Sequence, residues 1–280
     1  MQSSLRNTGS AVVRDEDLLH ACVRGMGSQL SAREDLALRH WWTVQERRST
    51  PLATELLAQP ESAWTRAVVQ HRAHRHAFFD ELAERADVME FAQFLLENWP
   101  LPPFLKLVER ALQAQIRGVA RATLMRNIHD ELFPTPHSEL MRRLMTAVKE
   151  RAGAGVNLEL GQSLIDRTLI FYYGYYCDPW NLVGSLFATE MMGQHRMARM
   201  GAGLTRLGFR ASELEFIRVH IECDEGHARD WMQSVLVPSI RTSPELCARI
   251  VGGIAACLVT SGRYLDDLCH RALQSRACAS

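Results

Sequence analysis

Three side chains able to bind a metal ion lie at helical spacing in the segment 212–234. His220, Asp224 and His227 follow one another at intervals of four and three residues. At about 100° per residue in an α-helix, Asp224 lies about 40° from His220, and His227 returns to within about 20°. All three can therefore project from one stripe of a helix. Two imidazoles and a carboxylate suit a first-row metal such as iron or manganese, so the spacing predicts a metal site for redox or hydrolytic chemistry.

A complete site needs ligands from other helices, because helical iron proteins collect carboxylates and imidazoles from several helices that face one core. Glu190 is one candidate. It is the only acid between Asp178 and Glu213, and the residues before it are mostly apolar. A lone carboxylate in such a helix is either paired or bound to a positive group. The alternative to a metal ion is a buried ion pair with Arg196 or Arg199.

Two further candidates flank a proline-rich turn. Glu131 closes one predicted helix and His137 opens the next. They cannot share a helix face, but a tight turn can bring both side chains toward one point. His129 and Asp130 compete for these roles. Taken alone, Glu131 is better explained as a surface acid at a helix end, and only the whole set of residues favours a ligand.

Together these residues resemble the ligand pattern of the haem-oxygenase-like diiron oxidases and oxygenases. The stretch 125–131 is similar to the first ligand helix of that family, and the likeness covers about residues 126–230. It implies an all-α, haem-oxygenase-like bundle that holds two irons, uses O2 as co-substrate and needs no haem. The implied iron ligands are Glu131, His137, Glu190, His220, Asp224 and His227.

The implied ligand set also bears on the substrate. Its carboxylates, Glu131, Glu190 and Asp224, are expected to take part in catalysis. Three carboxylates and three neutral imidazoles carry −3 against the +4 of two ferrous ions, and a slightly cationic site attracts an anionic substrate. The resemblance implies small amino acids or related carboxylates that undergo N-oxygenation, desaturation or C–C cleavage in specialised metabolism. The main alternative is oxidative decarboxylation of a fatty acid.

Aromatic residues before and after the ligand positions are candidates for the substrate pocket, although aromatics at helical spacing are more often core. They are Tyr172, Tyr176 and Trp231.

Other classes of protein remain open at this point. A ferritin-like diiron protein uses Glu-x-x-His motifs, and this chain contains none. A metal-free, thiaminase-like enzyme of the same fold would not need the three ligands of the 220–227 stripe together. A non-enzymatic helical scaffold could hold the same residues as a buried polar network. A metal analysis separates these readings.

The elements that must position these residues are predicted to be helices almost throughout. Pro51 is placed at a helix start and Pro60 at a break, and prolines or glycines end most other segments. We expect one domain over residues 13–274, with flexible ends at 1–12 and 275–280. The predicted helices cover about residues 13–23, 32–46, 51–84, 89–99, 104–130, 137–151, 160–175, 179–207, 212–236 and 245–273.

Composition limits the possible partners. The 280 residues include 47% hydrophobic residues, and 32 basic residues balance 32 acidic ones. We therefore expect a small-molecule carboxylate partner, with neither nucleic acid nor membrane, and a homodimer remains open. Seven cysteines without a Cys-x-x-Cys pair favour reduced thiols in the cytoplasm. The sequence contains no run of 18 apolar residues, so we expect no transmembrane helix.

Overall fold

The computed structural model describes residues 13–98, 100–113, 116–153, 155–156, 160–241 and 243–279, with side chains to residue 274. This part of the chain contains helices and no strand, which confirms the predicted all-α class. The N-terminal segment 1–12, predicted to be flexible, lies outside the described residues. At the other end, the backbone is helical to Ala279.

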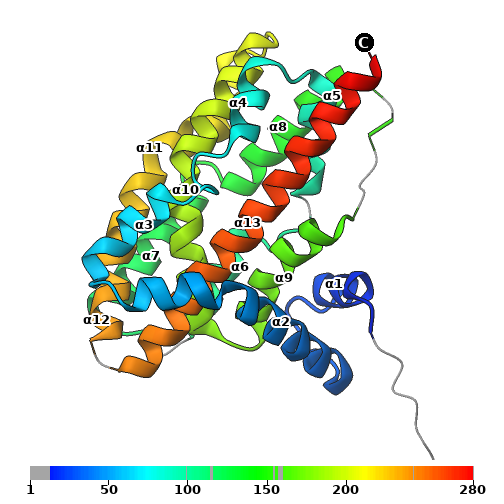
Figure 1. Cartoon of the computed structure of the whole chain (residues 1–280). Coiled ribbons are helices and arrows are strands. Elements are labelled where there is room, and N and C mark those ends of the chain that lie inside the picture. The colour runs from blue at the N-terminus through cyan, green and yellow to red at the C-terminus, as the bar shows by residue number, and fades with distance from the viewer. Residues whose placement is uncertain are drawn as a thin grey trace, which may run out of the picture.

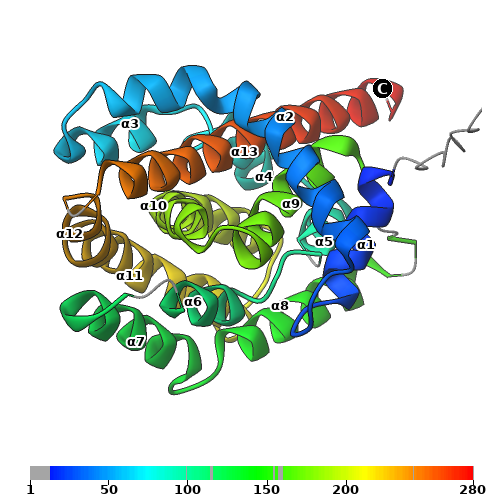
Figure 2. The same cartoon turned by 90° about the horizontal axis from the view of Figure 1, so that it is seen from below.

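The helices surround one central helix, α10, which Figure 2 shows nearly end-on. Helices α2, α3, α4 and α13 lie on one side of it, and α6, α7, α8 and α11 lie on the other (Figures 1 and 2). The bounds are α1 Asp15–Arg24, α2 Ala32–Leu57, α3 Trp64–Gln70, α4 Ala77–Glu84, α5 Val88–Glu97, α6 Phe104–Leu112, α7 Gly118–Leu132, α8 His137–Ala152, α9 Gln162–Tyr176, α10 Pro179–Arg206, α11 Glu215–Asp230, α12 Val237–Ile240 and α13 Pro244–Ala279.

The sequence of α10 explains its central position. Asp178 caps the helix through the backbone N–H groups of residues 180 and 181, beside a proline at the first helical position. The next two turns are fully buried on every side, as at Leu182 and Phe187. A helix that is apolar all round has to lie inside the protein. Gly184 lets α13 approach, because a Cβ there would lie 1.9 Å from the carbonyl oxygen of Ile250.

Helix α13 packs along α10 and is the most apolar of the long helices. Residues 244–274 are long and apolar enough to cross a membrane by length and composition, although the sequence contains no run of 18 apolar residues. In the structure, 61% of the apolar window is buried inside the protein. The apolar character of α13 is thus accounted for by its place in the core.

Pro51 lies inside α2 and does not start a helix, which corrects the prediction. Proline removes one backbone donor and crowds the preceding turn. Here Pro51 is exposed, and two hydroxyl groups in the turn before it donate to backbone carbonyls one turn earlier. Ser49 donates to the carbonyl of Gln45 at 3.0 Å, and Thr50 donates to that of Glu46 at 2.8 Å.

The single helix predicted over residues 104–130 is also wrong, because the structure divides it into α6 and α7. Gly118, the first residue of α7, has a φ of +59°. This left-handed conformation is open to glycine at little cost and interrupts a right-handed helix. The break matters for the site because it gives α7 its own direction and lets its C-terminal end face α11.

Two predicted elements that carry candidate ligands are confirmed with small shifts. Helix α11 contains the whole 220–227 stripe, and residues 231–236 continue it as a π-helical turn. Helix α8 begins at His137, and Pro136 occupies its N-cap position. No side-chain cap closes this helix start.

Candidate metal centre

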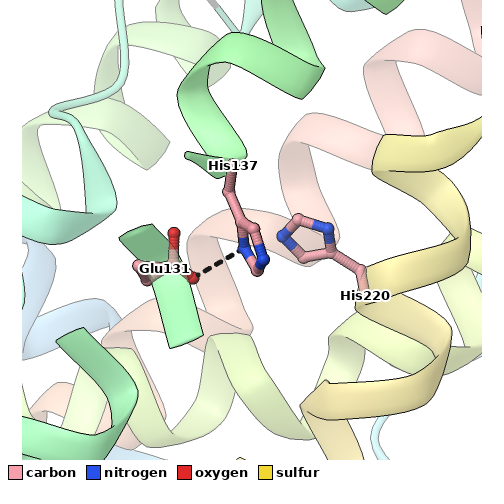
Figure 3. A group of neighbouring side chains, drawn as sticks. All are labelled: Glu131, His137 and His220. Carbon is pink, nitrogen blue, oxygen red and sulfur yellow. Dashed lines mark hydrogen bonds and ion pairs between the residues drawn. The ribbon is translucent and has the colours of Figure 1, made fainter. Parts of the chain in front are cut away.

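The turn between α7 and α8 brings two of the predicted ligands into contact. His137 Nδ1 lies 3.1 Å from Glu131 Oε1, and both side chains are largely shielded from solvent. His220 reaches the same point from α11, with its ring centroid 4.7 Å from that of His137. Figure 3 shows the three side chains converging from α7, α8 and α11. One donor atom from each lies within 4.8 Å of the others, so this triad could hold a metal ion.

The protein fixes which nitrogen His220 offers. His220 Nδ1 lies 2.7 Å from the backbone carbonyl oxygen of Phe216, one turn earlier in α11. A carbonyl can only accept, so Nδ1 carries the proton and Nε2 keeps its lone pair. Burial lowers the pKa of His220, which keeps the ring neutral at pH 7. A neutral imidazole held through its other nitrogen is the usual form of a metal-binding histidine.

A second triad lies deeper, between α10 and α11. It consists of Glu190, Asp224 and His227, all buried, and their donor atoms lie within 4.8 Å of one another. His227 Nδ1 faces Glu190 Oε2 at 3.7 Å, and its Nε2 lies 3.1 Å from Asp130 Oδ2. Asp130 therefore accepts a hydrogen bond from the outer nitrogen of His227. This leaves the inner nitrogen directed toward the buried carboxylate.

The electrostatics of the second triad favour a cation. Burial raises the pKa of Glu190 and, together with the Glu190 charge, that of Asp224. Burial also acts to lower the pKa of His227, but the carboxylates of Glu190 and Asp130 outweigh it and raise this pKa to about 9. Two buried carboxylates with one imidazole are costly without a positive partner. A divalent cation would supply that partner and stabilise both carboxylates in their charged form.

The two triads are neighbours. The charge of Glu131 in the first triad raises the pKa of both Glu190 and Asp224 in the second. His137 acts on Glu190 as well. Six ligands in two adjoining groups fit a pair of metal ions, which in dinuclear enzymes share one pocket. The donor set of carboxylate oxygens and imidazole nitrogens suits iron or manganese.

Gly193 makes room for the second triad, and the sequence analysis did not identify it. It lies three residues after Glu190 on α10 and faces α11. A Cβ at this position would lie 1.9 Å from Asp224 Oδ2, much closer than van der Waals contact. The space that Asp224 occupies therefore depends on the absence of a side chain at residue 193. The spacing Glu-x-x-Gly was the available signal, but a glycine in a helix has many explanations.

The structure decides between the alternatives that the sequence left open. Arg196 donates to the backbone carbonyl of residue 73, and Arg199 pairs with acids of α4, so neither forms the ion pair predicted as an alternative for Glu190. His129 is exposed and stacks on Phe133, away from the triads. Asp130 is not part of either triad but supports His227 from outside.

The aromatic residues predicted to line a substrate pocket divide into two groups. Tyr172 and Tyr176 donate their hydroxyls to the backbone carbonyls of Pro100 and Cys22, at 3.2 and 3.1 Å. They pack in the core formed by α1, α2 and α9, so they are core residues and do not line a pocket at the triads. The reason is that their stripe on α9 faces α1 and not α11.

Trp231 lies next to the ligand helices. It is fully buried after the last turn of α11, and its Nε1 donates to Asn127 Oδ1 of α7 at 2.5 Å. Asn127 precedes Glu131 by one helical turn. This hydrogen bond ties α11 to α7 at the level of the ligands, a role that the sequence alone did not indicate for Asn127.

The chain matches the model of a protein family, whereas comparison with individual curated proteins gave no match. Residues 91–261, more than half of the chain and all six candidate ligands, match the model of a family described as iron-containing redox enzymes. The match, the all-helical fold and the two triads agree with the predicted resemblance, and the chain belongs to this haem-oxygenase-like family of iron-containing redox enzymes.

Proposed function

We propose that this oxidoreductase is a non-haem diiron oxidase or oxygenase. The observation that carries the proposal is the pair of adjoining triads, which gather six nitrogen and oxygen donors from α7, α8, α10 and α11. Glu131, His137 and His220 would hold one iron, and Glu190, Asp224 and His227 the other. Two irons, when bound, supply redox chemistry with O2 as co-substrate.

The chain's own residues divide the remaining work. His220 is held neutral by burial and by the carbonyl of Phe216, so it is ready to bind without losing a proton. Asp130 orients His227 by accepting a hydrogen bond from its outer nitrogen. Trp231 is fully buried and holds α11 to α7 through its hydrogen bond to Asn127. Glu131, Glu190 and Asp224 are the carboxylates proposed to act in catalysis.

We further propose a small amino acid or a related carboxylate as substrate, within specialised metabolism. Six ligands of total charge −3 leave two ferrous ions with one net positive charge, which favours an anionic substrate. The reaction would be N-oxygenation, desaturation or oxidative C–C cleavage. We place it in the cytoplasm, because the six described cysteines form no disulfide and reduced thiols are typical of that compartment.

The first test is an anaerobic ferrous titration of the metal-free chain, followed by O2. We expect two irons per chain with two distinct Mössbauer environments, and O2 consumption that depends on both irons. Glu190→Ala and His227→Ala should retain helicity by circular dichroism but bind fewer than two irons and lose O2 consumption. Candidate substrates are then ranked by how much each accelerates O2 consumption, with amino acids and medium-chain fatty acids in separate arms.

Each outcome has a distinct reading. Acceleration by amino acids supports the proposed substrate class, whereas acceleration by fatty acids alone replaces it with oxidative decarboxylation. One iron per chain would contradict the diiron centre. No iron uptake, with ligand variants that behave like wild type, would leave a metal-free enzyme or a scaffold.

A further inference from the structure

Two arginines, Arg196 of α10 and Arg167 of α9, each bury a guanidinium N–H group in the interior. Arg196 follows Glu190 by six residues, which at about 100° per residue places it roughly 120° away around the helix. Arg196 Nη2 donates to the backbone carbonyl of Ala73 at 2.8 Å, whereas its Nε is buried without a hydrogen-bond partner. Arg167 of α9 donates Nη2 to Asn98 Oδ1 at 2.9 Å, and its Nη1 is likewise buried and unpartnered.

Both guanidinium groups border one core cluster, because Arg196 lies over the Phe79 ring and Arg167 over the Tyr264 ring, and both rings belong to that cluster. Arg167 is the charged group that acts most strongly on Arg196, and both act on the thiol of Cys257 in α13. The Arg167 guanidinium carbon also lies 4.7 Å from the ring centroid of Tyr264 in the same helix. The Cys257 thiol in turn contacts α10, because its Sγ lies 3.7 Å from Thr189 Oγ1.

The positive charge of this interior is not balanced by the described residues. The buried carboxylate of Glu97 accepts two hydrogen bonds from Arg271, of 2.8 and 2.9 Å, and one from the Tyr264 hydroxyl. The buried carboxylate of Asp166 pairs with Arg48 and Arg263. Among the described residues, neither Arg167 nor Arg196 forms an ion pair. Arg199, one turn further along α10, shows the contrast, because it pairs with two acids of α4.

Two guanidinium groups in such a place require an anion. Burial, and then the Arg167 charge, lower the pKa of Arg196, yet arginine remains protonated in proteins. Buried charges are costly unless they are paired and hydrogen-bonded. The two unpartnered N–H groups, Arg196 Nε and Arg167 Nη1, are donors without acceptors, which is the arrangement that a bound anion satisfies.

We propose that the Arg167–Arg196 site binds a small monovalent anion, either a halide ion or a carboxylate group. The enclosing helices favour a small ligand over a bulky one. The nearby Cys257 thiol is a further weak donor that suits either anion. Arg196 projects from a different face of α10 than Glu190, and the anion site shares no residue with the triads. It is therefore an addition to the proposed function and does not depend on it.

The experiment uses the iron-loaded full chain. Sodium bromide is titrated at constant ionic strength against sodium isethionate, whose anion is bulky. We expect a saturable rise in melting temperature, and at bromide about a hundred times its Kd the folding equilibrium constant should rise about a hundredfold. Crystals soaked in bromide should show an anomalous peak within hydrogen-bonding distance of Arg196 Nε and Arg167 Nη1. Formate in place of bromide tests the carboxylate class, by the same stabilisation and by competition for the peak.

Variants distinguish the site from a general salt effect. Arg196→Met and Arg167→Met keep an unbranched side chain and remove one charge, so we expect them to fold, with the bromide response lost. Arg199→Met is the matched control on the same helix and should keep the response. No anomalous peak together with no saturable response in the wild type would overturn the proposal. A wild-type response in both Arg196→Met and Arg167→Met would overturn it as well.

Discussion

The two triads differ in charge and in how their histidines are held. The first combines one carboxylate, Glu131, with two imidazoles, and the second combines Glu190 and Asp224 with one. The second is also the more deeply buried, so its charge is less screened by water. A divalent cation should therefore gain more from the second triad, provided that His227 offers its inner nitrogen. That orientation depends on a single outer hydrogen bond to Asp130.

Replacing Asp130 tests this dependence. In Asp130→Asn, the amide keeps the shape of the side chain but loses the charge that orients and polarises His227. Changes to such outer partners cost about 10- to 100-fold in metal affinity, so we expect a loss of that size for one of the two irons. An anaerobic titration with a competing chelator measures it.

The control is Asp230→Asn, which alters an exposed acid paired with Arg126. It should bind both irons with wild-type affinity. Equal affinities in the Asp130 and Asp230 variants would show that His227 needs no outer partner.

At the scale of the elements, the second triad depends on how closely α10 and α11 approach. The side chain of Asp224 occupies the space over Gly193, where a Cβ would lie 1.9 Å from its oxygen. Because both helices are packed against several others, they cannot separate freely, and close-packed interiors tolerate little added volume. A methyl group at this point must therefore displace the carboxylate.

We accordingly expect Gly193→Ala to lose one iron and to retain the other. Iron content and the Mössbauer spectrum check this directly, without any assay of turnover. The matched control is Gly226→Ala on α11, where a Cβ would meet nothing within 4 Å. That substitution should preserve both irons and slightly stabilise the chain, because alanine is the better helix former by roughly 1 kcal/mol. Two irons in Gly193→Ala would show that Asp224 can move and still bind.

At the scale of the whole molecule, the ligands join α10 to three helices that lie on one side of it, α7, α8 and α11. Without a cation, the cluster of carboxylates in this region opposes folding, and with one it becomes a cross-link between α7, α8, α10 and α11. The protein should therefore be markedly more stable with iron than without it, since any ligand that binds only the folded state stabilises it.

Glu190→Gln should be more stable than the wild type without iron and less stable than the wild type with iron. In the metal-free chain it removes a buried acid whose pKa is raised by burial, so the melting temperature should rise. One kcal/mol is worth about 2–4 °C in chains of 150–250 residues, and we expect a rise of that order. With ferrous iron under argon, the variant should gain less than the wild type and end below it. Melting curves of both proteins in both states measure the effect, and a lower metal-free melting temperature in the variant would contradict it.

The sequence alone determined the local part of the site. The 220–227 stripe lies on one helix, where a period of about 3.6 residues fixes which side chains share a face, and α11 carries it as predicted. Glu190 stood out because the helix around it is apolar, and the cost of burying a charge makes such a residue significant in any fold. The all-α class followed in the same way from periodicity and from the positions of proline and glycine.

Only the tertiary structure decided what crosses between helices. The sequence could not show that Asp130 rather than His129 turns toward His227, that Gly193 leaves room for Asp224, or that Tyr172 and Tyr176 face α1. It also placed a helix start at Pro51, which lies inside the continuous helix α2. Spacing along a chain fixes directions around one helix axis. Contacts between helices depend on how whole faces pack, and that is settled by the burial of many distant residues together.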